Sequence, residues 1–109
     1  MIKLINIHEL RARLITTWPE QKIIKLQDSP HYAYLCGDKQ PYIDYLKKAN
    51  QEEHSVEKFD KLIETFVLRS TDWIQCREQD GVYIISDGFH RACIFLHRGI
   101  TGIIINQIN

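Results

Sequence analysis

The stretch IISDGFHRACIFLHRGI, residues 84–100, decides the fold that this sequence predicts. Its first apolar residues end at Asp87 and Gly88, and the apolar residues after them recur at helical spacing, which predicts a helix over residues 88–98. Gly99 stands where a helix commonly closes with a left-handed residue. The stretch therefore holds a strand end, a polar turn and a complete short helix.

Strands are expected on both sides of this helix, over residues 82–86 and 101–108. A short crossover within one sheet normally joins two parallel strands through a right-handed connection. We therefore expect these two strands to be parallel. Ligands of open α/β sheets bind at the carboxyl ends of strands, where the next helix begins. Asp87, Gly88 and His90 lie at that point, so we expect a binding site there.

The rest of the chain predicts a compact α+β domain with a mixed sheet. SVEKFDKLIETFVL, residues 55–68, is the clearest helix, because its apolar residues recur every three or four positions. HELRARLI, residues 8–15, predicts a short helix, because Leu10 and Leu14 share one helical face. The remaining predicted elements are strands over 2–7, 22–26 and 73–77, a turn over 78–81, a helix over 41–50 and an ordered loop over 29–40.

Composition and charge describe one ordinary globular domain over residues 1–109. Fourteen basic residues balance 14 acidic ones. A protein that binds duplex DNA normally carries a basic excess, because phosphate neutralisation supplies much of its affinity, so nucleic acid is not an expected partner. The three cysteines are widely spaced and form no CxxC pair, which fits a reducing compartment. No signal-peptide core or membrane-spanning run is found, so we expect a cytoplasmic protein without a membrane partner.

The turn DGFHR carries the residue types that bind phosphate. A helix N-terminus presents unpaired N–H groups and a partial positive charge to an anion. Gly88 lets a ligand oxygen approach the backbone, and the guanidinium of Arg91 can hold a phosphate with two parallel hydrogen bonds. His90 can donate to a phosphate oxygen, and Asp87 can cap the helix or hold Mg²⁺. These residues, with Phe89 between them, form the expected nucleotide site.

A purely structural interpretation of the same turn stays open at this point. Asp before Gly is common at strand-to-helix turns, where it serves as a cap alone. His90 then packs on a neighbouring side chain, and Arg91 pairs with a surface carboxylate such as Glu78.

The segment VYIISDGFHRACIFLHRGITGIIINQI resembles the signature segment of the ParB/sulfiredoxin-like superfamily. Members of that superfamily place a Gly-x-x-Arg or Gly-x-His-Arg turn after a strand, then a helix that ends in glycine, then a last strand. The resemblance covers the first strand and residues 55–109 and implies that fold. Residues 16–50 depart from it as a Tyr-rich insertion. Where sulfiredoxins carry their reactive cysteine, this chain has Phe89, which excludes sulfinic-acid reduction.

The turn is most similar to that of the free serine kinase branch of the superfamily. This resemblance implies a nucleotide-dependent kinase that phosphorylates a hydroxyl group of an amino acid or a sugar, with ATP or ADP (or CTP) and Mg²⁺ as cofactors. A glutamate ahead of the long helix is the general base in that branch, and Glu52 or Glu53 stands at this place. Asp87 would hold the metal. Acidic residues ahead of a helix are also favoured by its dipole alone.

The insertion holds SPHYAYLCGDKQPYIDYL, in which tyrosines alternate with polar residues. Its His31 and Tyr32 are candidates for an acceptor-substrate pocket, whereas Tyr42 and Tyr45 are expected to pack the insertion against the sheet. Similar segments occur in ParB-like domains that accompany bacterial surface-glycan enzymes. This similarity implies an alternative function, that of a non-catalytic nucleotide-binding or regulatory module.

Other residues are expected to have structural roles. Cys93 is expected in the core, because free cysteine is commonly buried. Arg11 and Arg13 are expected on a solvated helix face. A ParB-type DNA binder or nuclease is a third interpretation, which the neutral net charge disfavours. The sequence leaves the oligomeric state open.

Overall fold

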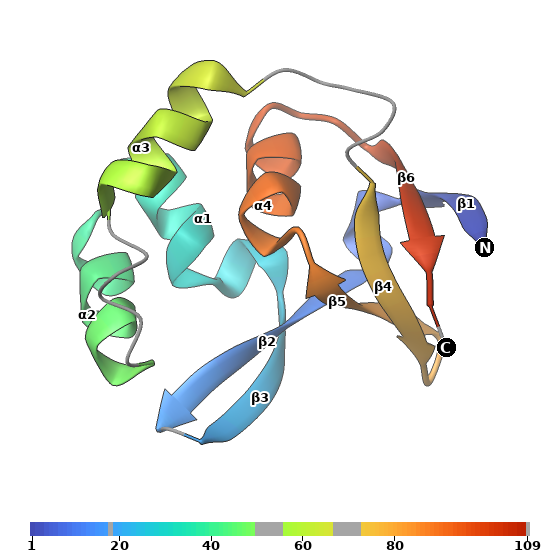
Figure 1. Ribbon diagram of the computed structural model, residues 1–109, viewed down its shortest axis with the longest axis horizontal. Coiled ribbons are helices and arrows are strands. Elements are labelled where there is room, and N and C mark those ends of the chain that lie inside the picture. Colours follow the sequence, from blue (N-terminus) through green and yellow to red (C-terminus); the bar gives the residue numbers. More distant parts are fainter. Residues whose placement is uncertain (18, 50–55, 67–72, 109) are drawn as a thin grey trace.

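The computed structural model describes residues 1–17, 19–49, 56–66 and 73–108 (Figure 1). Its elements, in chain order, are β1 (Ile2–Asn6), the 3-10 helix η1 (Ile7–Glu9), β2 (Leu10–Thr17), β3 (Glu20–Lys25), the 3-10 helix η2 (Leu26–Asp28), α1 (Pro30–Leu35), α2 (Gln40–Lys48), α3 (Val56–Thr65), β4 (Ile74–Gln79), β5 (Val82–Asp87), α4 (Phe89–His97) and β6 (Gly102–Gln107). The radius of gyration is 13.4 Å, which is that of a compact chain of this length. None of the helices in the described part of the chain is long and apolar enough to cross a membrane.

The predicted α+β class with a mixed sheet is confirmed. Six strands form one sheet in the order β1-β6-β4-β5-β2-β3. The pairs β2–β5 and β4–β6 are parallel, and the other three pairs are antiparallel. Because β2 and β5 are parallel neighbours, both strands run toward the same edge of the sheet, and β2 continues past the paired residues in its hairpin with β3. That edge is where α4 begins.

The expected parallel arrangement of β5 and β6 is wrong. β4 forms an antiparallel hairpin with β5 and takes the place beside it, and β6 pairs in parallel with β4 instead. β6 therefore runs opposite to β5. The chain leaves the end of β5 through α4 and then turns into β6, which starts at the end of the sheet where β5 finishes (Figure 1). The rule on crossovers does not cover this case, because it concerns strands that run parallel to each other.

The predicted helix over residues 8–15 is also wrong, since only η1 is helical there and β2 starts at Leu10. Leu10 and Ala12 are buried, and the arginine between them is more exposed, which is the two-residue period of a strand. β-Branched residues fill the end of the segment and favour extended backbone. Pairing with two strands, β3 and β5, then decides the outcome. Arg11 and Arg13 consequently lie on a sheet face and not on a helix.

The segment expected to be a loop contains α1. Ser29 caps this helix by accepting a hydrogen bond from the N–H of Tyr32, and Pro30 occupies its first turn, where proline fits well. α1 packs against α2 and α4. Tyr42 and Tyr45 are buried, as expected, and close the packing between this helical layer and β2.

The core lies between the sheet and α4. Ile74, Cys76 and Ile105 are fully buried on the face that α4 covers, and Cys93 of α4 packs there, as predicted. Side chains at the alternate strand positions lie on the opposite face, where Leu4 and Ile104 are exposed. All three cysteines are free thiols.

Candidate functional site

A cleft of about 610 Å³ opens where the parallel strands β2 and β5 end, and we call it the sheet cleft. Ile15 of β2, Ile84 and Ser86 of β5 and the first residues of α4 line it. Its volume is within the range of small-molecule sites. The cleft thus forms at the carboxyl end of β5, which is the place that the sequence predicts for a ligand.

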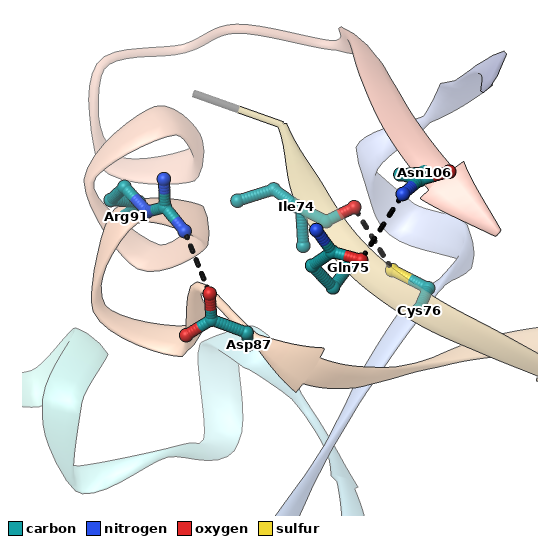
Figure 2. A network of polar contacts seen from close by, with 6 residues as sticks. All are labelled: Ile74, Gln75, Cys76, Asp87, Arg91 and Asn106. Carbon is teal, nitrogen blue, oxygen red and sulfur yellow. Dashed lines mark hydrogen bonds and ion pairs between the residues drawn. The ribbon is translucent and has the colours of Figure 1, made fainter. Parts of the chain in front are cut away.

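The N-terminus of α4 forms one wall of this cleft. Gly88 is its N-cap residue, with φ +101°, and no side chain caps the helix by a hydrogen bond. The predicted capping role of Asp87 is therefore wrong, because Asp87 ends β5 and its carboxylate lies 3.5 Å from the guanidinium of Arg91. Figure 2 shows Arg91 reaching back from α4 toward Asp87 at the strand end. Arg91 therefore pairs with a carboxylate of its own turn and not with Glu78, which pairs with Lys3.

Gly88 is required by the packing of this corner as well as by its backbone conformation. A Cβ at this position would lie 2.9 Å from Cδ1 of Ile74 and 3.0 Å from Nη2 of Arg91. Figure 2 shows Ile74, which comes from β4, beside the turn. The side of Gly88 where a ligand was expected to approach is thus filled by protein side chains. Gly88 also lines the sheet cleft, which leaves the turn accessible from that side.

His90 and His31 meet at the wall of the sheet cleft. Their ring centroids are 4.7 Å apart in an edge-to-face arrangement, and both rings line the cleft. Nε2 of His90 lies 3.0 Å from the hydroxyl of Tyr42, and His31 stacks on Phe89 at 4.0 Å. The predicted candidate His31, from the insertion, is therefore brought next to the predicted turn.

His31 is held neutral. Only 2% of its surface is exposed, and its Nδ1 has no hydrogen-bond partner in the described part of the chain. Burial, and after it the nearby His90, lower the pKa of His31 well below its ordinary value of 6.5. A buried polar atom without a partner is costly, and such atoms commonly mark sites where a ligand completes the hydrogen bonding.

A second, smaller cleft of about 310 Å³ lies on the other side of the same turn, and we call it the helix cleft. Residues 87–90 line both clefts, while Lys58, Phe59 and Arg91 line the helix cleft alone. The turn therefore separates two cavities, one bounded by strands and one by α3.

The other predicted site residues are not gathered here. Tyr32 lines neither cleft, and its ring lies 6.0 Å from that of His97. Glu52 and Glu53 lie outside the described residues. In the described ranges, no group of three or more His, Cys, Asp or Glu residues could hold a metal ion. Mg²⁺ bound to a nucleotide needs only one or two carboxylates, so the expected role of Asp87 stays a prediction.

Two arginines that the sequence analysis did not assign to a site line the sheet cleft, and one of them was expected on a solvated helix face. They are Arg13 of β2 and Arg77 of β4, and both are exposed. Neither side chain forms an ion pair or hydrogen bond with any other described residue. The alternation of LRARLITT was the available signal, because a strand there places every second residue on one face.

No family model matches the chain, and no match is found among curated proteins or solved structures. The resemblance to the ParB/sulfiredoxin-like superfamily therefore rests on the turn motif and on the order of the elements around it.

Proposed function

We propose that the sheet cleft binds the phosphates of a nucleotide at the N-terminus of α4. The observation that carries this proposal is the uncapped N-terminus of α4 at Gly88, which lines one cleft together with His31 and His90. The helix N-terminus attracts an anion, and the two histidines add polar rings to the same wall. Phe89 and the ring of His90 give the same wall an aromatic part for a base or sugar.

Within this proposal, the protein is a nucleotide-dependent kinase that phosphorylates a hydroxyl group of a small molecule, an amino acid or a sugar. Phosphoryl transfer needs held phosphates, neutralised charge and a hydroxyl in line with the transferred group. His90, which lines the sheet cleft, would hold phosphate oxygens, and Arg91 would reach them from the helix cleft on the other side of the turn. Asp87, which is exposed at the cleft edge, would hold Mg²⁺ together with the phosphates. Bound Mg²⁺ would supply charge neutralisation. Glu52 or Glu53 would take the proton from the hydroxyl.

One observation favours a second candidate, a nucleotide-binding module without catalysis. Asp87 is the only carboxylate among the described residues that line the sheet cleft, and it is paired with Arg91. A carboxylate that stabilises its own turn is a weaker metal ligand. The turn then binds a nucleotide without supplying a complete metal site.

We further propose that the chain belongs to the ParB/sulfiredoxin-like superfamily and works in the cytoplasm. Support for the family comes from the Gly-x-His-Arg turn between β5 and α4 and from the last strand after Gly99. Support for the compartment comes from three free thiols.

The test is a binding titration with ATP and ADP with and without Mg²⁺, followed by incubation with labelled ATP and a pool of small metabolites. We expect binding in the micromolar range and a phosphorylated product that is lost in the Glu52→Gln or Glu53→Gln protein. Binding without any product, unchanged by these substitutions, supports the module. No binding of any nucleotide contradicts both candidates.

A further inference from the structure

The sheet cleft contains more positive charge than the predicted turn supplies. Arg13 and Arg77 line it, and the single carboxylate among its described lining residues, Asp87, is already paired with Arg91. Arg91 itself lines only the helix cleft. Burial keeps His31 neutral, so it adds no charge. The cleft is therefore cationic in a protein whose formal net charge is zero.

The strand register places these two arginines on either side of β5. Arg77 is the pairing partner of Ile84 on β4, and Arg11 is the partner of Ile84 on β2. Arg13 follows Arg11 by two residues on β2, and both Arg13 and Ser86 line the sheet cleft. The two arginines therefore line the cleft from the two strands that neighbour β5.

The arginines and the helix N-terminus lie at different depths of the cleft. Gly88 comes four residues after Ile84, which is about 13 Å of extended chain at roughly 3.3 Å for each residue. The arginine side chains shorten this gap. A linear chain of two or three phosphates bound at the helix N-terminus would span more of it than a single phosphate. Guanidinium groups are well suited to phosphate oxygens because they donate two parallel hydrogen bonds.

We infer that Arg13 and Arg77 form a subsite for the second and third phosphates of the ligand, and that the cleft selects polyphosphates over monophosphates. This inference rests on the proposed phosphate site at α4. Arg13 of β2 and Arg77 of β4 would distinguish polyphosphates from monophosphates. The turn at the start of α4 would bind the one phosphate that all these ligands have in common.

The experiment compares AMP, ATP and inorganic tripolyphosphate by calorimetric titration at low salt. We expect Arg13→Gln and Arg77→Gln each to weaken ATP and tripolyphosphate binding about ten- to hundredfold, which is the usual effect of losing a charge-assisted hydrogen bond. AMP binding should change less than about twofold. The steepness of the dependence of ATP affinity on salt should fall in both variants, because fewer cations then contact the ligand.

Lys25→Gln is the matched control. Lys25 is the pairing partner of Arg11, so it lies on the same face, one strand farther out, and it does not line the sheet cleft. Its loss should leave ATP affinity within about twofold of the unaltered protein. Arg13→Lys keeps the charge and should recover part of the lost affinity, and its melting curve and those of the Gln variants check that the fold is retained.

The outcomes separate the two levels of the proposal. If the unaltered protein binds neither AMP nor ATP nor tripolyphosphate, the phosphate site at α4 is wrong and the subsite is wrong with it. If ATP and AMP bind and the two Gln variants lose both equally, or lose neither, only the polyphosphate subsite is wrong. Equal loss with Lys25→Gln would likewise show a general effect of charge and overturn the subsite.

Discussion

The two clefts share the wall formed by residues 87–90 and differ in how their cations are used. In the helix cleft, the guanidinium of Arg91 lies against Asp87, with 24% of its side chain exposed. In the sheet cleft, Arg13 and Arg77 have no partner among the described residues. A paired cation stabilises its own turn, whereas an unpaired cation in a cavity is available to a ligand. The arginine of the DGFHR motif is therefore already paired, whereas the two arginines outside the motif are available to a ligand of the sheet cleft.

The shared wall should be the most sensitive part of the molecule. Gly88→Ala combines a left-handed backbone conformation with a Cβ placed 2.9 Å from Ile74 and 3.0 Å from Arg91. We expect a loss of about 2 to 4 kcal/mol in the free energy of unfolding, measured by denaturant titration. Both clefts should change shape together, because they share this residue.

Gly37→Ala is the control for this substitution. Gly37 has φ +100°, nearly the same as Gly88, but a Cβ there would meet nothing within 4 Å. We expect only the cost of backbone strain, about 1 kcal/mol. Equal losses in the two variants would mean that the contacts with Ile74 and Arg91 contribute nothing.

The difference between the clefts also explains which parts of the candidate site could be predicted from the sequence. The turn DGFHR was found because its chemistry and its position are both local: β5, Gly88 and α4 follow one another in the chain. Helix α3 was predicted for the same reason, since a regular apolar period decides it. A structural element whose deciding residues are all neighbours in the chain can therefore be predicted from the sequence of that segment.

Arg13 could not be assigned in this way. HELRARLI fits a helix through Leu10 and Leu14 and fits a strand through Leu10 and Ala12, and the choice depends on backbone partners far away in the chain. β3 and β5 supply those partners and make it a strand. Arg77 could not be assigned to the site for the same reason, because it lines the cleft only as a result of the pairing of β4 with β5. A site assembled from neighbouring strands requires the sheet order, which the sequence does not state.

Acid should lower the free energy of unfolding through His31, which lies in the wall of the sheet cleft. The pKa of His31 in the folded protein is lowered below 6.5, mainly by burial, so the unfolded chain binds more protons as the pH falls below that value. The stability is therefore fully present above about pH 6.5 and decreases toward pH 5. The slope approaches about 1.4 kcal/mol for each pH unit when one proton is taken up on unfolding.

Denaturant titrations at several pH values between 5 and 7.5 measure this slope. His31→Phe keeps an aromatic ring at the position and should flatten the dependence. His97→Gln, at an exposed histidine of α4, should leave it unchanged. A slope that persists in His31→Phe would assign the effect to another group.

A smaller loss of stability is expected from a substitution in the helix cleft. Tyr42 lines it, is fully buried, and hydrogen-bonds through its hydroxyl to Nε2 of His90 at 3.0 Å. Burial, with nearby charges adding to it, raises the pKa of Tyr42 to about 12, so the hydroxyl keeps its proton at every ordinary pH. Tyr42→Phe should lower the free energy of unfolding by about 1 kcal/mol. Tyr83→Phe, which removes a hydroxyl without a partner among the described residues, should cost less than about 0.5 kcal/mol.

The smallest effect on stability is expected at Arg91. Its partner Asp87 is 75% exposed, and such ion pairs contribute between about 0 and 1 kcal/mol because water and salt screen them. Arg91→Gln should therefore change the melting temperature little, and a double-mutant cycle with Asp87→Asn should give a coupling energy below about 1 kcal/mol. In ligand titrations, Arg91→Gln should reduce ATP affinity less than Arg13→Gln or Arg77→Gln does. This order follows because release of Arg91 to a phosphate requires it to leave Asp87, whereas the two strand arginines give up only water. If Arg91→Gln instead causes the largest loss of affinity at an unchanged melting temperature, the guanidinium moves from Asp87 to the ligand, and the direct interpretation of the turn motif is restored.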